Sequence, residues 1–279
     1  MSGIQNLSIK YSIFRNKSMV GVAITSVKFE WVEQKVKNAS NRPFLLHYGV
    51  KAPKASYISL KGPMRIHSNK YIESIGIPLK IAKELNEGLA ENKRNFMLIL
   101  VRPRNKGAIT DLKTNFTGTL ANEIINTIKI KSADIYNILI PKLTLPNNCN
   151  QKKLDDTLFH WNSFLQIWNQ PEFNEISDGI SFDHFYHFAY FSISNDGIGF
   201  DDFHSVDLPS EHTQNSENGQ QFQPYKEAYN ICFDSPFLFL IVELHYNIPL
   251  IIGSYAGEPA LLKSQTRKYR KKEVICCLC

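Results

Sequence analysis

The residues best suited to bind a metal ion gather in one part of the chain. They are Asp183, His184, His187, Asp201, Asp202 and His204. Zinc and calcium sites draw their ligands from recurring short spacings, and these six residues follow none of them. We expect them on a strand and a loop and predict no metal site. The nearby Gly-Ile-Gly at residues 197–199 lacks the third glycine and the helix of a phosphate-binding loop, so no cofactor is predicted either.

Two cysteines, Cys149 and Cys232, could act as nucleophiles. Catalysis would need a histidine to activate the thiol, and nothing in the sequence pairs either cysteine with one. A buried free thiol is the commoner role for such residues. The five cysteines also lack the spacing of a disulfide framework or of a zinc site. We therefore predict no enzymatic activity and free thiols.

The C-terminal segment, SQTRKYRKKEVICCLC, combines basic residues with cysteines. Five lysines and arginines precede Cys276, Cys277 and Cys279. A polybasic patch beside acylated or prenylated cysteines can hold a protein on an anionic membrane surface, and the last three residues resemble the Cys-x-Cys end of doubly prenylated small GTPases. The other interpretation is a solvated tail without lipid. Both interpretations stay open.

Composition and charge narrow the classes of partner. The chain has 279 residues, of which 43% are apolar and 21% charged, and a formal net charge of +6. Without the five basic residues of the tail little positive bias remains, so we expect no nucleic-acid partner. There is no recognisable secretory signal and no apolar run long enough to span a membrane. The compartment is unknown, with the cytoplasm as the default.

Apolar patterns predict mixed α and β structure with many antiparallel strands. Strands are expected at Gly21–Trp31, 42–49, 57–67, Asn95–Pro103, 133–146 and Phe182–Ser194, and helices at Asn115–Lys131 and Lys153–Trp168. Asn95–Pro103 is a continuous apolar run ended by proline, which is typical of a strand buried on both faces. The residues from Ile198 to Tyr229 show little periodicity.

The order of these motifs resembles the serpin family. The terminal hairpin FDSPFLFLIVELHYNIPLIIGSYAGEP is similar to the closing pair of buried strands in that family, and ILIPKLTLP, IWNQPEFNEIS and HFAYFSISNDG are similar to three earlier segments. The matching residues are Pro141, Lys142, Phe173, Ile176, Phe233, Pro236, Phe237, Gly253 and Pro259. The resemblance extends over residues 21–259.

This resemblance implies an α+β, serpin-like fold with large, mainly antiparallel sheets, packed helices and an exposed loop at residues 198–230. Residues 1–20 would form an irregular N-terminal segment, 21–259 a partial serpin domain and 260–279 the basic tail. The N-terminal helices of the family have no counterpart before residue 21. We therefore expect exposed apolar surface and self-association.

Serpins inhibit by inserting the cleaved loop as a strand into their largest sheet, and this resemblance implies a hinge where the loop begins. The hinge residues would be Asn195, Asp196, Gly197, Ile198, Phe200 and Asp202. Gly197 matches the family, whereas the residues that follow it are bulky or acidic. Burying an unpaired carboxylate costs on the order of several kcal/mol, so we expect weak inhibition or none.

The resemblance implies a serine or cysteine protease as partner, but the sequence does not fix the bond it would cut. Counting forward from the hinge places this bond between Glu211 and His212, whereas counting back from the terminal hairpin places it between Tyr225 and Lys226. The loop is longer than is usual in the family, which is why the two counts disagree. An alternative function is a non-inhibitory interaction or membrane-associated scaffold that uses the loop and the tail.

Overall fold

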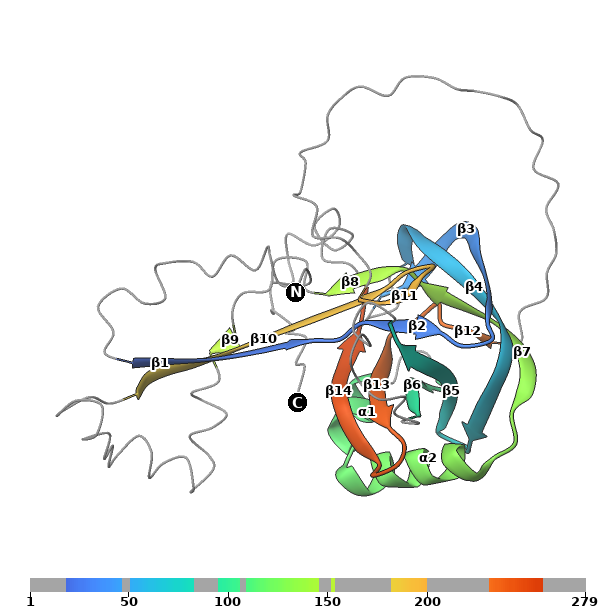
Figure 1. Cartoon of the computed structure of the whole chain (residues 1–279). Helices are drawn as coiled ribbons and strands as arrows, with labels where there is room; N and C mark the ends of the chain where they lie inside the picture. Colours follow the sequence, from blue (N-terminus) through green and yellow to red (C-terminus); the bar gives the residue numbers. More distant parts are fainter. Residues whose placement is uncertain are drawn as a thin grey trace. The chain divides into compact units, whose positions relative to one another are not determined.

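The computed structural model describes residues 19–46, 51–82, 95–105, 109–145, 152–153, 182–199 and 231–257 (Figure 1). Strands predominate among these residues, and two helices, α1 and α2, accompany them. The chain divides into two compact units, and the boundaries between them include one after Val27 and one after Phe191. The expected α+β character is confirmed.

A parallel strand pair forms the described part of the first unit. β1 (Met19–Ser26) lies beside β10 (Phe182–Ile193) with the same direction, and Ser26 stands opposite Tyr190. The short β9 (Lys152–Lys153) also pairs with β10 and runs antiparallel to it. Parallel neighbours require a long connection between them, and here that connection passes through the second unit. The last two residues of β10 already belong to the second unit.

The centre of the second unit is a run of five antiparallel strands in the order β4, β5, β6, β13, β14. Their bounds are Lys51–Ser68, Ile72–Ile81, Phe96–Pro103, Phe237–Glu243 and Ile248–Tyr255. All of β13 is buried, and so is all of β6 except Arg102. The predicted strand at Asn95–Pro103 is therefore confirmed, and its uninterrupted apolar sequence reflects burial on both faces.

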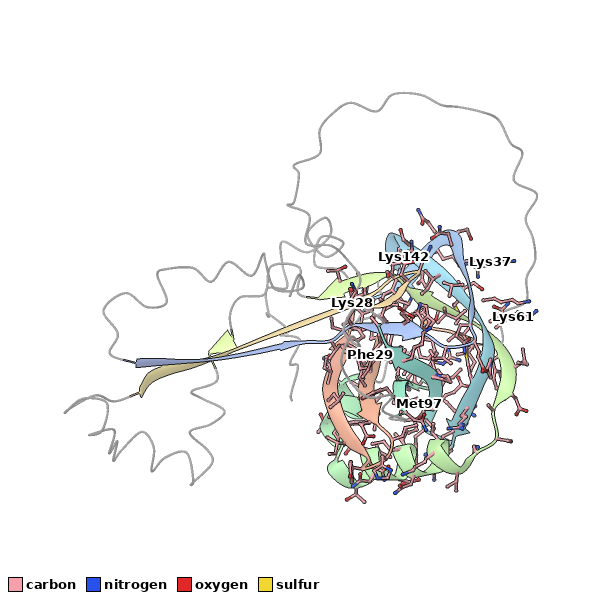
Figure 2. The ribbon with its side chains drawn as sticks, viewed as in Figure 1. Lys28, Phe29, Lys37, Lys61, Met97 and Lys142 are labelled. Atoms are coloured by element: carbon pink, nitrogen blue, oxygen red, sulfur yellow. The ribbon has the colours of Figure 1, made fainter. Side chains whose placement is uncertain are left out.

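The long strand β4 continues into a second layer. It pairs with β3 (Lys35–Leu45) along residues 51–61 and with β7 (Asp134–Pro141) along residues 57–64, and its last residues pair with β5. β12 (Ile231–Cys232) extends this layer parallel to β7. Lys37 of β3 and Lys61 of β4 point outward, whereas Phe29 and Met97 lie in the interior (Figure 2).

Three short strands complete the described elements. β2 (Phe29–Trp31) lies between β5 and β11 (Gly197–Ile198), and both of its neighbours run antiparallel to it. β11 also pairs with the end of β10, where Ile193 stands opposite Ile198. β8 (Leu143–Leu145) follows β7 along the chain. The segment at 197–198 is therefore held between two strands.

The helices cover one face of the five-stranded run. α2 (Gly118–Ile130) begins after Thr117, whose hydroxyl accepts the Leu120 N–H at 3.3 Å, and α1 (Ile109–Asn115) precedes it. The buried stripe of α2 packs on β6 and β13. Its members are Ala121, Ile124, Ile125 and Ile128, and they face Met97, Ile99, Val101, Leu238, Leu240 and Val242. The helix predicted at Asn115–Lys131 is confirmed as α2, which begins three residues later and ends one residue earlier than predicted.

Aromatic side chains fill the opposite face of the run. Phe44 meets Tyr255 with ring centroids 5.2 Å apart, and Phe237 lies 5.3 Å from Phe233 and 5.6 Å from Tyr255. Phe29 packs on Phe96 at 4.9 Å. Pairs of this geometry contribute beyond the area that they bury. They join the terminal hairpin to β3 and to the segment after β12.

Two sequence predictions need correction. The single strand expected at Gly21–Trp31 is two strands, because β1 pairs with β10 whereas β2 pairs with β5 and β11. Lys153, expected to start a helix, instead lies in β9, and the remainder of that helix falls outside the described residues.

Within the described part of the chain, the helices are too short or too polar to cross a membrane.

Candidate functional site

The first four residues of the predicted hinge lie in the turn between β10 and β11 and in β11 itself. The Ser194 N–H donates to the Gly197 carbonyl at 2.9 Å, and the Gly199 N–H donates to the Ser192 carbonyl at 3.1 Å. Gly197 and Gly199 have φ values of 148° and 77°, in a region that residues with a side chain rarely adopt. Glycine at these two positions lets the chain reverse within a few residues.

The hinge turn is fixed to its surroundings by backbone and side-chain contacts. Gly197 pairs with Glu30 and Ile198 with Phe29, and the Ile198 side chain is fully buried. The Trp31 indole N–H donates to the Ser194 carbonyl at 3.2 Å. Asn195 Nδ2 donates to the Asn38 side chain at 3.0 Å. The first residues of the predicted hinge are therefore part of a folded strand system. The exposed loop expected from residue 198 does not begin there, because Ile198 is buried in β11.

β10, the strand that leads into the hinge turn, pairs with β1 in the first unit. They are direct neighbours along the whole of β1, with a shift in register only between Met19 and Val20. Each backbone hydrogen bond between them would have to be broken before another strand could enter. In this structure the sheet of the first unit is closed at that position.

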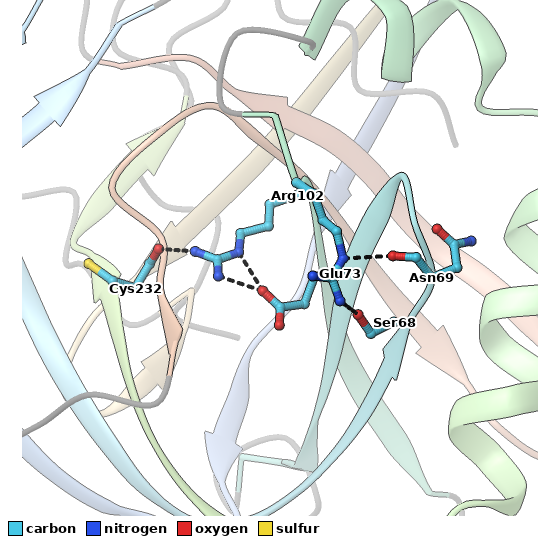
Figure 3. Close-up of polar contacts among 6 residues, drawn as sticks. Ser68, Asn69, Glu73, Arg102 and Cys232 are labelled. Carbon is cyan, nitrogen blue, oxygen red and sulfur yellow. Dashed lines mark hydrogen bonds and ion pairs between the residues drawn. The ribbon is translucent and has the colours of Figure 1, made fainter.

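The segment after the predicted loop is anchored at several points. The Phe233 N–H donates to the Leu139 carbonyl at 2.8 Å, and the Leu45 N–H donates to the Asp234 carbonyl at 2.7 Å. The Cys232 carbonyl accepts a hydrogen bond from the Arg102 guanidinium (Figure 3). These contacts attach the C-terminal end of the loop to β3, β6 and β7.

Arg102 is at the centre of this anchor. Its Nε donates to Glu73 Oε2 at 2.8 Å, and its Nη2 reaches the same oxygen. The guanidinium carbon lies 5.6 Å from the centre of the Phe233 ring. Arg104, just after β6, donates from Nε to the Asn69 carbonyl at 2.6 Å. One half-buried cation thus joins β5, β6 and the segment after the loop.

Tyr57 lies in the same neighbourhood, and its phenol has a raised pKa. Its side chain is 1% exposed, and its hydroxyl donates to the Pro43 carbonyl at 3.4 Å. Burial raises the pKa of the Tyr57 phenol well above its ordinary value, and the nearby Cys232 and Asp234 raise it further. The phenol is therefore neutral in the folded protein at physiological pH.

Comparison with known families shows to which family the chain belongs. The family profile described as Serpin (serine protease inhibitor) matches residues 2–257. The chain belongs to the serpin family. That family is one of protease inhibitors rather than enzymes, and its members typically bind the proteases that they target.

Solved serpin structures share the fold. A Manduca sexta serpin-12 is 15% identical with a TM-score of 0.60, and the match covers 87% of this chain and 57% of that one. Arabidopsis AtSerpin1 in its native stressed conformation is 15% identical with a TM-score of 0.51, covering 82% and 54%. A Schistosoma haematobium serpin is 14% identical with a TM-score of 0.53, covering 85% and 56%. No curated protein matches. The chain spans little more than half the length of these serpins.

The structure brings together part of the site predicted for this serpin. Asn195, Asp196, Gly197 and Ile198 form one turn and strand. The remaining candidates lie outside the described residues: Phe200 and Asp202 of the hinge, Glu211, His212, Tyr225 and Lys226 at the candidate scissile bonds, and Cys276, Cys277 and Cys279 of the tail. Among the described residues no cluster of histidine, cysteine and carboxylate side chains is suited to hold a metal ion.

Sequence reasoning missed the partners of the hinge and of the loop end. In the sequence, Trp31 is recognisable only as the last residue of an apolar strand. Arg102 is recognisable only as a polar residue near the end of an apolar run. Arg102 was the better signal, because a charged residue inside a strand buried on both faces requires a partner. Its partners, Glu73 and Cys232, are 29 and 130 residues away.

Proposed function

We propose that this serpin presents the part of residues 198–230 that follows β11 to a serine or cysteine protease as a substrate, and that it inhibits weakly or not at all. The observation that carries the proposal is the state of Ile198. This residue is fully buried in β11 and is paired with Phe29 of β2. Insertion of the loop would begin at the hinge, so this residue would have to leave its site first.

Removing the hinge from its site is costly for two reasons. The backbone pairs of β11 with β2 and β10 would be broken, and the contacts of the buried Ile198 side chain would be lost. Fully burying an isoleucine stabilises a fold by about 1.5–3 kcal/mol. The small residues usual at a serpin hinge make fewer buried contacts, so moving them costs less free energy. A slow first step favours hydrolysis in the competition between insertion and release of the protease.

The sheet opposes insertion as well. β1 and β10 would have to separate along their paired length before the loop could enter. The sequence that would enter includes Asp201 and Asp202, and either strand register turns one of these carboxylates inward. An uncompensated buried carboxylate costs on the order of several kcal/mol. Both considerations support a loop that a protease cleaves but that does not insert into the sheet and retain the protease.

The proposal is tested by incubating the purified chain with trypsin-like, chymotrypsin-like and papain-like proteases. We expect cleavage between residues 198 and 230, no covalent complex on a denaturing gel, and no rise in the melting temperature of the cleaved protein. A stable complex accompanied by a higher melting temperature would overturn the proposal. Mapping the cut by mass spectrometry distinguishes the Glu211–His212 bond from the Tyr225–Lys226 bond.

A matched variant tests whether the hinge is the cause. Ile198→Thr, Phe200→Ala and Asp202→Ala in one chain replace the bulky and acidic hinge residues with small uncharged ones. If the hinge alone prevents insertion, cleavage of this variant raises its melting temperature, whereas cleavage of the parent does not. If neither chain gains stability on cleavage, the closed β1–β10 pair is the stronger obstacle.

A further inference from the structure

Three lysines share one face of the layer formed by β3, β4 and β7 in the second unit. Lys35 on β3 stands directly opposite Lys61 on β4, and Lys37 lies on the same face, because side chains two residues apart along a strand share a face. All three residues are exposed. Lys37 and Lys61 point outward from the ribbon (Figure 2). We call Lys35, Lys37 and Lys61 the lysine face.

The lysine face carries a charge that its own two strands do not balance. β3 and β4 contain no aspartate or glutamate along their whole length. Glu33 lies in the bend before β3 and offsets at most one of the three charges. Like charges directly opposite each other on neighbouring strands destabilise a sheet. The pairing of Lys35 with Lys61 therefore favours an anionic partner at this face.

Protection of a sheet edge explains only part of this pattern. β3 has a single partner among the described strands, so lysines on it discourage pairing with another chain. Lys61, however, lies on β4, where it is paired with Lys35 of β3 on one side and with Asn137 of β7 on the other. A lysine on an interior strand has no edge to protect. Its place opposite another lysine requires a different explanation.

The segment between β11 and β12 has the opposite charge. Residues 200–230, which we call the acidic segment, contain a single lysine, Lys226, and no arginine. Their acidic residues are Asp201, Asp202, Asp207, Glu211, Glu217 and Glu227. The acidic segment is therefore strongly negative at neutral pH, and its charge is complementary to that of the lysine face.

The residues on both sides of the acidic segment are attached to the layer that carries the lysine face. Before the segment, Asn195 Nδ2 donates to the side chain of Asn38 at 3.0 Å, and Asn38 directly follows Lys37 on β3. After the segment, Ile231 pairs with Ile138 of β7. A chain of this length spans at most roughly 100 Å when extended, so the length of the segment allows its acidic residues to reach the lysines.

We propose that the lysine face binds the acidic segment of the same chain. Attachment at both ends makes the contact intramolecular, and effective concentrations of flexibly linked groups reach roughly the millimolar range. Ion pairs that are individually weak are then sufficient, and salt weakens them. A bound segment is a poorer protease substrate, because it must leave the lysines before a protease binds it. The inference does not depend on whether the protein inhibits, since the contact precedes any protease.

Zero-length cross-linking of the full chain tests the contact directly. A carbodiimide joins a carboxylate to a lysine amine where the two touch, and mass spectrometry identifies the joined peptides. We expect products that join the lysine face to the acidic segment at low salt and their loss at high salt. Lys80 and Glu30, with Nζ and Oε2 2.8 Å apart, are the internal control. Cross-linking of this control pair without any product from the lysine face to the acidic segment would overturn the proposal.

A mixture of isotopically light and heavy chains identifies the source of the bound segment. Products that join only light to light or heavy to heavy peptides show contact within one chain, as expected. Mixed products in statistical proportion would show that the lysine face binds the acidic segment of a second copy, which contradicts the proposal.

Two matched variants connect the contact to the exposure of the segment. The first variant removes the lysine face by Lys35→Gln, Lys37→Gln and Lys61→Gln. The control variant removes three exposed lysines of the β4–β5 turn and the helices by Lys70→Gln, Lys113→Gln and Lys129→Gln. A glutamate-specific protease measures exposure, because neither variant changes its sites in the acidic segment.

We expect cleavage within residues 200–230 to be about three- to five-fold faster in the first variant than in the parent at low salt, and equally fast in the two chains at high salt. A free peptide of residues 200–230 corrects for the effect of salt on the protease itself. Equal rates in the parent and the first variant at low salt would contradict the proposal. The same acceleration in the control variant would also contradict it, because overall charge would then be the cause.

Discussion

At the scale of single residues, Arg102 has the clearest structural role. It joins Glu73, the Cys232 carbonyl and the Phe233 ring, and the side chains of Arg102 and Glu73 are each 20% exposed. A cation in this position is desolvated enough for its partners to matter, yet it is not deeply buried. Its contacts hold the segment that follows the predicted loop.

Replacing Arg102 with methionine should destabilise the protein by about 2 kcal/mol, because hydrogen bonds to charged groups are lost and Glu73 loses its partner. Urea unfolding followed by tryptophan fluorescence measures the change. Lys80→Met is the matched control, since Lys80 is 50% exposed in its pair with Glu30 and should cost about 0.5 kcal/mol or less. Equal losses in the two variants would show that the position of Arg102 gives it no special role.

The raised pKa of the Tyr57 phenol predicts that the free energy of unfolding falls at alkaline pH. Its pKa is raised in the folded state, whereas in the unfolded chain the phenol loses its proton near its ordinary pKa of about 10. The stabilisation is therefore fully present below about pH 10 and is lost as pH rises above it. Unfolding curves at pH 8 and pH 11 should show a smaller loss for Tyr57→Phe than for the parent. Parallel losses would contradict this assignment.

At the scale of elements, the close pairing of β13 with β14 depends on Gly253. This residue stands opposite Phe239, and a Cβ at Gly253 would overlap the Phe239 ring. The phenyl ring thus covers the backbone of the neighbouring strand, which is possible only where the side chain is absent. The glycine in the terminal hairpin motif consequently has a packing role.

Gly253→Ala should destabilise the protein by about 1–3 kcal/mol, because a buried ring would have to move. The double variant Gly253→Ala/Phe239→Leu should lose less than the sum of the two single changes, since the smaller side chain makes room for the methyl group. Chemical denaturation of all four chains gives the coupling. Additive losses would mean that the ring and the glycine do not interact.

Most elements of this fold were predictable from local patterns. The Asn95–Pro103 strand and the Asn115–Lys131 helix have long apolar runs or stripes, and both are confirmed. α1 was missed because its seven residues bury only Ile109 and Leu112, which is too short a pattern to recognise. The break between β1 and β2 was missed because both sides of it are apolar and only their partners differ.

At the scale of the whole molecule, the edges of the sheets bear on the predicted self-association. Among the described strands, β14 pairs only with β13, and it contains no charged residue. β3 also has a single partner in that part of the chain, but it carries Lys35, Lys37 and Arg42. Charged side chains discourage edge-to-edge pairing, so β14 is the edge less protected against it.

We predict that the chain associates as its concentration rises and that Ile248→Lys reduces the association. Ile248 is 49% exposed at the start of β14, so lysine there places a charge beside the open edge at little cost to folding. Ile130→Lys is the control, because Ile130 is 83% exposed but lies on α2. Sedimentation velocity measures both variants. A larger effect from Ile130→Lys would place the association at the helix surface instead.

The sequence by itself determined the strand and helix types, the serpin resemblance and the unusual bulk of the hinge, because these depend on side-chain size and spacing along the chain. The tertiary structure alone decided which distant segments meet. Trp31 bonds to Ser194 across 163 residues, Arg102 bonds to Cys232 across 130, and β1 lies directly beside β10. Periodicity states which face of a strand is buried but carries no information on which strand will lie beside it. The position of the hinge turn follows from those pairings, so only the folded chain could reveal it.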